Sequence, residues 1–593
     1  MKSKLFKKTE SKAEKGSLSN VFLLLLAASY CVLALMIHSE YRCDALVLSI
    51  IPCFATVLIL FSGRKKPELE RSENAFIMLF SLLGMAMLSF VDIVNFTVCK
   101  LTQAAALRVA IGVYFFAAVY FCTCFVLKFI YKLFLKERTL KPTEKKKPYV
   151  FYVIIIAFVT TLFLIAAGYG YDGYDTLTVY AYFKEKGIWF DWHTLSYEML
   201  MALCLTLMPN APFVFPLIVV QCIMWTAVTA YAMKTLYEVF ASEKVLKVYT
   251  LLSLIIFAPI YYAPMGIKDT VFSMFMYAFC ISIFNVLRKA NPTKKDYILL
   301  AVNASLASLF RHAAVEVVAV SLLILLLYRA FKYKNKQEIK RYIAIMITPV
   351  IVFVGVTVGI GDGVLHKYYN PKFVKYTLPI YYSVSCADKL GNDFGDENKA
   401  VLERIMPLED WIEAYKEDRY WADTVTRDWG GIGEGVYKFD DEFYKGIIKV
   451  NASLVTHHPL TYLESMFDMT SIVWRVGNPN DCNAFYPSGE EVKEYELYRP
   501  SVAGEIIDSY IEFSVENTLL CSILWRGGFW ILTAIFASFV LIKKKRAEWL
   551  FMILPVVIFA ATLFVSIPAQ DPRYVLSFVE VGMFYALVAF YTE

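Results

Sequence analysis

Two aspartates in a polar segment after a long apolar run could do acid–base chemistry. The segment reads Tyr169-Gly-Tyr-Asp-Gly-Tyr-Asp-Thr and so contains Asp172 and Asp175. A carboxylate held at the boundary of a low-dielectric region has a raised pKa and can take the proton of a hydroxyl group. Asp and Gly also form ordinary solvated turns, and that reading explains Asp175 about as well. Asp191 and His193 follow in the same segment, just before a short apolar run.

Charged residues also stand in three later turns, each directly beside an apolar run. These turns contain Lys268-Asp269, Arg311-His312 and Arg573-Tyr574. A guanidinium in such a turn can hold a lipid phosphate through two parallel hydrogen bonds, or it can extend to the membrane interface as a simple anchor. Asp269, at the start of an apolar run, could equally cap a helix by accepting backbone N–H bonds.

Metal and nucleotide sites have little support in the sequence. None of the six histidines has the H-x-x-x-H or H-E-x-x-H spacing of zinc sites. The glycine-rich run 430–435 lacks the preceding strand and the following βαβ unit of a dinucleotide site. We therefore assign no cofactor and no metal ligands, and the sequence leaves open whether a divalent metal ion assists.

The elements that must position these residues are apolar runs of membrane-spanning length. Hydrophobic residues make up 58% of the 593 positions and charged residues only 19%, against about 45–50% and about 25% in soluble domains. Because a backbone in lipid must satisfy its own hydrogen bonds, runs of roughly 17–25 apolar residues predict helices. Such runs occur at 20–37, 45–61, 75–94, 109–134, 149–167, 213–233, 245–262, 270–287, 297–310, 313–328, 342–358, 520–542, 547–566 and 574–591.

Lys and Arg cluster in alternate connections between these runs. The clusters include 7–15, 64–71, 136–147, 288–295, 329–341 and 543–546. Because such clusters mark the cytoplasmic side, we predict a plasma-membrane protein with both termini in the cytoplasm. The connections that carry the candidate residues, including the first external loop 168–212, are then extracytoplasmic. The short apolar run 195–208 in that loop predicts a helix at the interface, not a span.

The segment 359–516 differs from the rest of the chain in length and charge. Its 28 acidic residues outnumber 15 basic ones by 13, so the remainder carries +19 to reach the net charge of +6. This division indicates two compartments and argues against a nucleic-acid partner. We predict a mainly helical extracytoplasmic domain, with helices over 397–425 and 440–470. Cys386 and Cys482 lie in it, and whether they pair is left open.

The order of these features resembles the GT-C superfamily of membrane glycosyltransferases, most closely bacterial members related to protein-mannosyltransferase-like enzymes. An Asp-bearing first loop precedes an interfacial helix, a Lys-Asp turn, an Arg-His turn, a large external domain and a late Arg-Tyr turn. The similarity extends over 149–591. The fold expected is an all-α polytopic membrane protein with about fourteen spans. Its parts are a four-span extension, a GT-C-like core, the acidic domain and three last spans, at 1–148, 149–358, 359–516 and 517–593.

The resemblance implies a glycosyltransferase that uses a polyprenyl-phosphate sugar as donor, among membrane lipids. The acceptor would be an extracytoplasmic glycan, lipid or protein. On the matching motif positions Asp175 would be the base, with Asp172 and Asp269 as further catalytic carboxylates. The substrate-binding residues would be Asp191, His193, Lys268, Arg311, His312, Arg573 and Tyr574. The usual His-Pro-Pro-Leu opening of the interfacial helix is here His193-Thr-Leu, so this motif departs from the family pattern.

Two other functions fit parts of the pattern. A transporter or flippase of lipid-linked glycans would have polar groups near the middle of the membrane and internal repeats, and we find no convincing repeat. Asp92, Lys128 and Glu316 fall within apolar stretches and would favour transport. A cell-surface polysaccharide polymerase or ligase of a different fold would also carry a large external loop.

Overall fold

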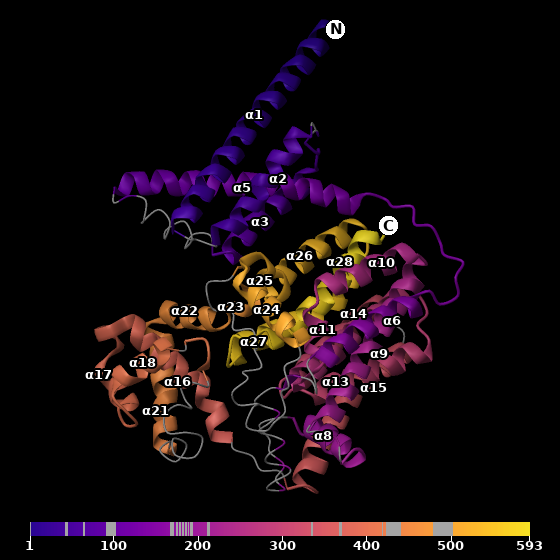
Figure 1. Ribbon diagram of the computed structural model, residues 1–593, viewed down its shortest axis with the longest axis vertical. Coiled ribbons are helices and arrows are strands. Elements are labelled where there is room, and N and C mark those ends of the chain that lie inside the picture. The colour runs from indigo at the N-terminus through magenta and orange to yellow at the C-terminus, as the bar shows by residue number, and fades with distance from the viewer. Residues whose placement is uncertain are drawn as a thin grey trace.

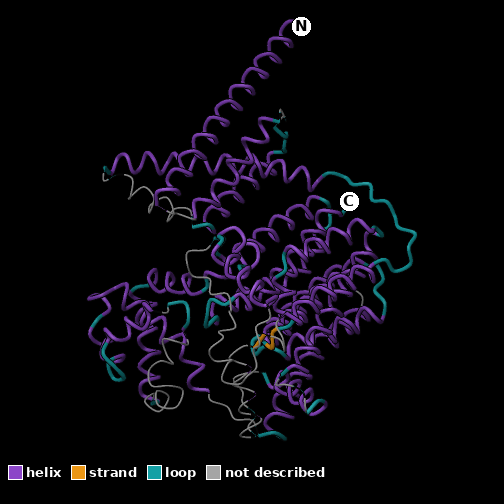
Figure 2. Tube along the Cα trace, in the orientation of Figure 1, coloured by secondary structure: helices purple, strands orange, loops and turns teal. Residues whose placement is uncertain are grey.

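The computed structural model is built almost entirely of helices (Figure 1), with one pair of very short strands (Figure 2). It describes residues 2–41, 45–62, 64, 66–89, 102, 104–166, 171, 172, 176, 180, 183, 187, 189, 194–209, 211, 214–333, 336–366, 371–417, 419–422, 440–477 and 502–593. Within these residues the single sheet is the parallel pair β1 (Tyr171–Asp172) and β2 (Met265–Gly266).

The first four helices form a bundle with an apolar cluster of its own. They are α1 (Lys2–Tyr41), α2 (Ala45–Phe61), α3 (Arg71–Met87) and α5 (Ala105–Leu135). Tyr30, Cys53 and Phe115 are buried in that cluster, which is separate from the main core. Helices α3 and α5 pack against α26, and Arg138, just after α5, donates to the carbonyl of Phe590 at 2.9 Å and lies over its ring.

The main bundle surrounds α12. Its helices are α6 (Tyr149–Ala166), α8 (Leu195–Leu207), α9 (Phe215–Phe240), α10 (Glu243–Ile255), α11 (Ala258–Tyr262), α12 (Lys268–Arg288), α13 (Lys294–Leu309), α14 (Ala314–Tyr333) and α15 (Lys336–Val354), which continues as the π-helix η1 (Gly355–Asp362). The apolar stretch of α12 is 100% buried, whereas that of Ile339–Asp362 is only 11% buried. Helix α12 is therefore central, and α15 faces outward.

A separate group of helices, which we call the outer domain, lies beside the main bundle (Figure 1). It consists of α16 (Pro371–Leu390), η2 (Gly391–Phe394), α17 (Asp396–Leu402), α18 (Leu408–Glu417), α21 (Asp441–His457), α22 (Pro459–Met469) and α23 (Ser471–Trp474). Helix α16 packs against α18, α21 and α22 and buries Tyr381 and Val384. Cys386 on this helix is a free, buried thiol, and Cys482 lies outside the described residues.

The last part of the chain returns to the main bundle. It comprises α24 (Val502–Glu516), α25 (Thr518–Leu524), α26 (Gly527–Lys543), η5 (Ala547–Ile553), α27 (Leu554–Ser566), η6 (Pro572–Val575) and α28 (Leu576–Tyr591). Helices α25 and α26 are bent by 64° at Trp525–Arg526, so the run 520–542, expected to be one span, is broken near its start.

The prediction of an all-α, multi-pass membrane protein is confirmed. Among the described residues nine helices are long and apolar enough to cross a membrane, or ten if α25 and α26 form one bent span. Large apolar side chains such as Phe151, Ile165 and Ile351 are more than half exposed on these helices, as a lipid-facing surface requires. The remaining predicted runs coincide with shorter helices: α2, α3, α10 with α11, and α13.

Candidate functional site

Asp269 is a carboxylate buried at the start of the central helix α12. Its side chain is 1% exposed and forms an ion pair with Arg311, which donates from Nη1 to Oδ1. The Nε of Arg573 lies 3.8 Å from the other carboxylate oxygen. Burial of an unpaired carboxylate would cost several kcal/mol, so the two guanidinium groups compensate for the charge that α12 buries.

Arg311 follows α13 and reaches Asp269 across an aromatic surface. Its side chain is 14% exposed. The guanidinium carbon lies 4.7 Å from the ring centre of Tyr574 and 5.1 Å from that of Phe559. Aromatic faces attract cations, so the rings hold this guanidinium in a fixed plane. One edge of Arg311 thus meets Asp269.

Arg573 is held by the short helix η6 between two carboxylates. Asp571 caps this helix, because its Oδ1 accepts the backbone N–H of Arg573 at 2.9 Å. Its other oxygen lies 3.1 Å from Arg573 Nε. Asp571 is fully buried and Arg573 is 8% exposed. We call Asp269, Arg311, Asp571, Arg573 and Tyr574 the outer cluster; its two arginines balance its two aspartates.

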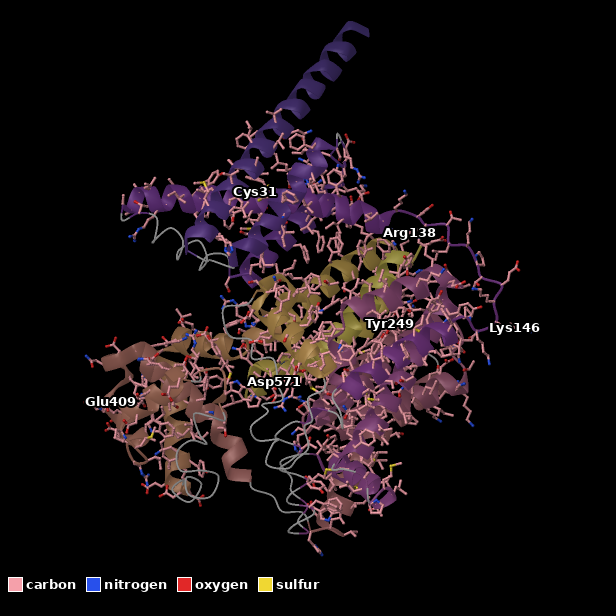
Figure 3. The ribbon with its side chains drawn as sticks, in the orientation of Figure 1. Cys31, Arg138, Lys146, Tyr249, Glu409 and Asp571 are labelled. Atoms are coloured by element: carbon pink, nitrogen blue, oxygen red, sulfur yellow. The ribbon has the colours of Figure 1, made fainter. Side chains whose placement is uncertain are left out.

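The loop that carries Asp571, which Figure 3 labels, is hydrogen-bonded to the outer domain. Gln570 donates from its backbone N–H to the carbonyl of Tyr420 at 2.9 Å. Its side chain donates to the carbonyl of Asp468 at 2.6 Å and accepts from the hydroxyl of Ser471 at 2.7 Å. Hence the outer domain and the main bundle meet at the loop from which Arg573 enters the cluster.

Arg526 is a buried arginine beside this loop that was not among the site residues predicted from the sequence. It is 0% exposed and donates to the Ser471 hydroxyl at 3.2 Å and to the carbonyl of Arg475 at 3.2 Å. Its Nη1 has no hydrogen-bond partner within the described part of the chain. Through Ser471 it connects to Gln570, the neighbour of Asp571. The only sequence signal is a lone arginine between apolar residues and two glycines.

The loop 168–212, predicted to be the first external one, meets the turn that carries Asp269 at strand β1. Strand β1, which includes Asp172, pairs in parallel with β2, and Asp172 is opposite Gly266. The hydroxyl of Thr176 donates to the carbonyl of Gly266. Of Asp172 only the backbone is placed, while Asp175, Asp191 and His193 lie outside the described residues. The role of Asp175 as the base therefore stays a prediction. Its neighbour in sequence, Thr176, is held beside the turn of Asp269 by its hydrogen bond to Gly266.

The other predicted site residues lie around the cluster with different exposures. Lys268 is half-buried beside Asp269, His312 is exposed beside Arg311, and Tyr574 is buried under Arg311. Of the polar residues noted in apolar stretches, Lys128 is half-buried, Glu316 is exposed and Asp92 is outside the described residues. Where the chain is described, no group of three or more His, Cys, Asp or Glu could hold a metal ion.

One family is similar to this chain over most of its length. The match covers residues 191–593, from within the loop 168–212 to the last residue, and includes every member of the outer cluster. The family is described as a family of unknown function, DUF6020. No curated protein and no solved structure matches the chain. Since the match spans more than half of the sequence, the chain belongs to the DUF6020 family.

Proposed function

We propose that this protein is a plasma-membrane glycosyltransferase that moves a sugar from a polyprenyl phosphate to an extracytoplasmic glycan, lipid or protein. One observation carries the proposal: Arg311 and Arg573, far apart in sequence, converge on Asp269 at one end of the central helix. Two guanidinium groups fixed side by side suit a phosphate group better than a single interfacial anchor would.

The chemistry asks for a base and for cations. The acceptor oxygen forms a bond to the anomeric carbon, the bond from that carbon to the phosphate oxygen breaks, and the acceptor proton passes to the base. The departing phosphate gains negative charge, which preplaced guanidinium groups stabilise. Asp175 is the proposed base, with Asp172 beside it. Asp269 orients the arginines instead, because both of its oxygens face guanidinium groups.

The proposed fold is GT-C-like, with the shorter helices α2, α3, α10–α11 and α13 completing about fourteen spans. In the predicted orientation, both termini are cytoplasmic and the outer domain is extracytoplasmic. The acceptor would bind between that domain and the cluster, since Gln570 joins the two.

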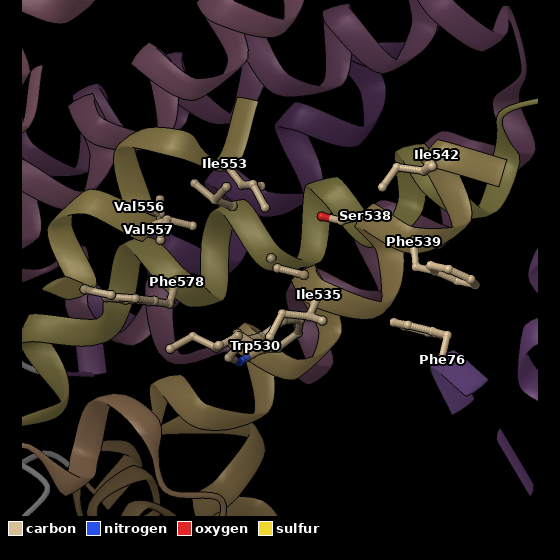
Figure 4. A pocket seen from close by; sticks show the side chains of 15 residues that line it. Phe76, Trp530, Ile535, Ser538, Phe539, Ile542, Ile553, Val556, Val557 and Phe578 are labelled. Carbon is tan, nitrogen blue, oxygen red and sulfur yellow. The ribbon is translucent and has the colours of Figure 1, made fainter. Parts of the chain in front are cut away.

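An apolar groove close to the cluster could hold the lipid tail (Figure 4). It has a volume of about 330 Å³ and runs between α26, α27 and α28, with Trp530, Ile535 and Phe578 among its lining residues. The ring of Phe578 lies 6.0 Å from that of Phe559, on which Arg311 rests. A phosphate at Arg311 would therefore be separated from the groove only by the neighbouring rings of Phe559 and Phe578.

The direct test is transfer by the purified full-length chain in liposomes. Radiolabelled polyprenyl-phosphate hexoses would be supplied with membrane glycans, and release of polyprenyl phosphate would be measured. We expect Asp175→Asn to abolish release without changing thermal stability or membrane insertion, whereas Glu316→Gln, at an exposed position on α14, should act like the parent. Undiminished release in Asp175→Asn would eliminate Asp175 as the base.

A flippase of lipid-linked glycans is the second candidate, and one observation favours it. Glu580 lies buried within α28, where an ionisable group often marks a transport path. Movement of a fluorescent polyprenyl-phosphate sugar between leaflets, with no release of polyprenyl phosphate from any donor, would replace the transferase proposal with this one.

A further inference from the structure

Glu580 is an acid inside the last helix that the proposed transfer step does not use. It is 2% exposed, and its Oε2 has no hydrogen-bond partner within the described residues. The hydroxyl of Ser273 on α12 lies nearby and donates to the backbone carbonyl of Thr270 at 2.9 Å. Burial of an ionised carboxylate with only a neutral partner is strongly unfavourable, so the resting form here is the neutral acid.

Among the residues that the structure describes, none brings a cation to Glu580 that would offset its ionised form. Its titratable neighbours are Tyr277 and Cys280 on α12 and Tyr249 on α10 (Figure 3 labels Tyr249). The hydroxyls of Tyr249 and Tyr277 are 3.0 Å apart and bond to each other. Elements α5, α9, α11, α26, α27, η5 and η6 also pack against α28, and within the described residues they bring no charged side chain to Glu580.

Glu580 lies on the same α12–α28 seam as the outer cluster. Ser273 is one turn after Asp269 on α12, and Glu580 is seven residues after Arg573. Asp269 neighbours Arg573 at the start of α12, and Ser273 neighbours Glu580 one turn further along this helix. Seven helical residues span about 10 Å, a distance at which charges in a protein interior still interact.

The buried charges around the cluster show what ionisation of Glu580 would change. Among the described residues, the two arginines of the outer cluster are balanced by Asp269 and Asp571. A neutral Glu580 leaves this balance unchanged when an anionic ligand arrives. An ionised Glu580 would add a negative charge that repels the ligand.

We infer that Glu580 binds a proton and thereby controls the affinity of the outer cluster for a phosphate group: the protonated acid favours binding and the carboxylate weakens it. This inference rests on the proposed function, which places the phosphate at Arg311 and Arg573. One unit charge at about 10 Å and an effective dielectric constant of about 20 changes affinity roughly tenfold.

The test uses dihexadecyl phosphate, a phosphodiester lipid whose single charge does not change over the pH range studied. Its binding to the full-length chain in nanodiscs would be measured from pH 6 to pH 9, with inorganic phosphate as a second arm. We expect affinity for the lipid to fall roughly tenfold as pH rises. Glu580→Gln should bind tightly throughout, Glu580→Asp should keep a pH dependence, and Glu316→Gln should match the parent. If inorganic phosphate binds and the lipid does not, the outer cluster is a site for a free anion.

The failure of this inference can be distinguished from failure of the proposed function. Infrared difference spectra report the carbonyl band of a protonated carboxylic acid without any ligand. A band that is lost in Glu580→Gln and titrates in the parent supports the proton site. If the lipid binds equally well at every pH, or if the carbonyl band of Glu580 is missing, the role of Glu580 is overturned and the proposed function is not. Absence of any lipid binding in the parent, with the band present, overturns the phosphate site. If Glu580→Gln fails to fold, Glu580→Asp and the parent spectra decide.

Discussion

At the residue scale, Asp269 and Arg311 depend on each other. The aspartate is 1% exposed, and removal of one partner of a buried ion pair typically costs about 3–5 kcal/mol because the other charge stays buried. We expect Asp269→Ala and Arg311→Ala each to lower the free energy of unfolding by about that amount. The double variant should lose much less than the sum, because it leaves no unpaired charge.

Thermal inactivation of the detergent-solubilised variants would measure this coupling. Lys399→Ala, which removes an exposed pair with Glu403, is the matched control and should cost under about 1 kcal/mol. Additive losses for Asp269 and Arg311 would contradict a shared ion pair.

The residues at helix ends were accessible from sequence, and those inside helices were not. Asp269, Arg311 and Arg573 stand at the ends of apolar runs. Their residue types and positions therefore predicted that these three side chains lie on the same side of the membrane. Arg526 and Glu580 interrupt apolar runs, and a single charge gives no indication of which other helix it meets. Asp571 resembled an ordinary turn residue, because its pairing with Arg573 depends on the conformation of η6.

At the element scale, two glycines allow α26 to begin against the outer domain. A Cβ at Gly528 would lie 2.5 Å from the backbone carbonyl oxygen of Trp474, a contact that neither backbone can relieve without moving. Gly528→Ala should therefore separate α26 from α23 and weaken the hydrogen bond of Arg526 to Ser471. We expect a loss of stability of about 2–4 kcal/mol, as for other overpacked buried sites.

A second glycine supplies the comparison for that variant. A Cβ at Gly355, on the outward-facing η1, would meet nothing within 4 Å. Gly355→Ala should leave the half-life at elevated temperature unchanged or slightly longer, while Gly528→Ala shortens it. Equal half-lives for the two variants would contradict the tight packing of α26 on α23.

Helices were predictable where their apolar runs were long and unbroken. The periodic, continuous runs of α5, α9 and α12 indicated their helices directly. The bend of 64° between α25 and α26 was not predicted, because an apolar run carries no information about direction. Helix α16, which contains Pro379 and the central buried tyrosines of the outer domain, was also not predicted. The helix expected over 397–425 is instead α17 and α18, separated by the turn at 403–407.

At the scale of the whole molecule, the outer domain and the main bundle meet where α22 and α23 pack against α26 and α27, and the loop before η6 lies at this junction. Gln570 ties that loop to the domain, while Asp571 and Arg573 extend from it into the cluster. An acceptor bound by the domain and a lipid phosphate bound by the bundle would thus meet at the same place. The sequence predicted the outer domain and the membrane-spanning helices as separate parts. It did not predict how they join, because the junction depends on side-chain hydrogen bonds between segments about a hundred residues apart.

The central claim is that the outer cluster holds the phosphate of a polyprenyl-phosphate sugar. The most direct measurement is a cryo-electron microscopy structure of the full-length chain with such a lipid bound. We predict the phosphate within hydrogen-bonding distance of both Arg311 and Arg573, with its isoprenoid tail in the groove between α26 and α28. A phosphate bound elsewhere, with both arginines still turned toward Asp269, would contradict the account.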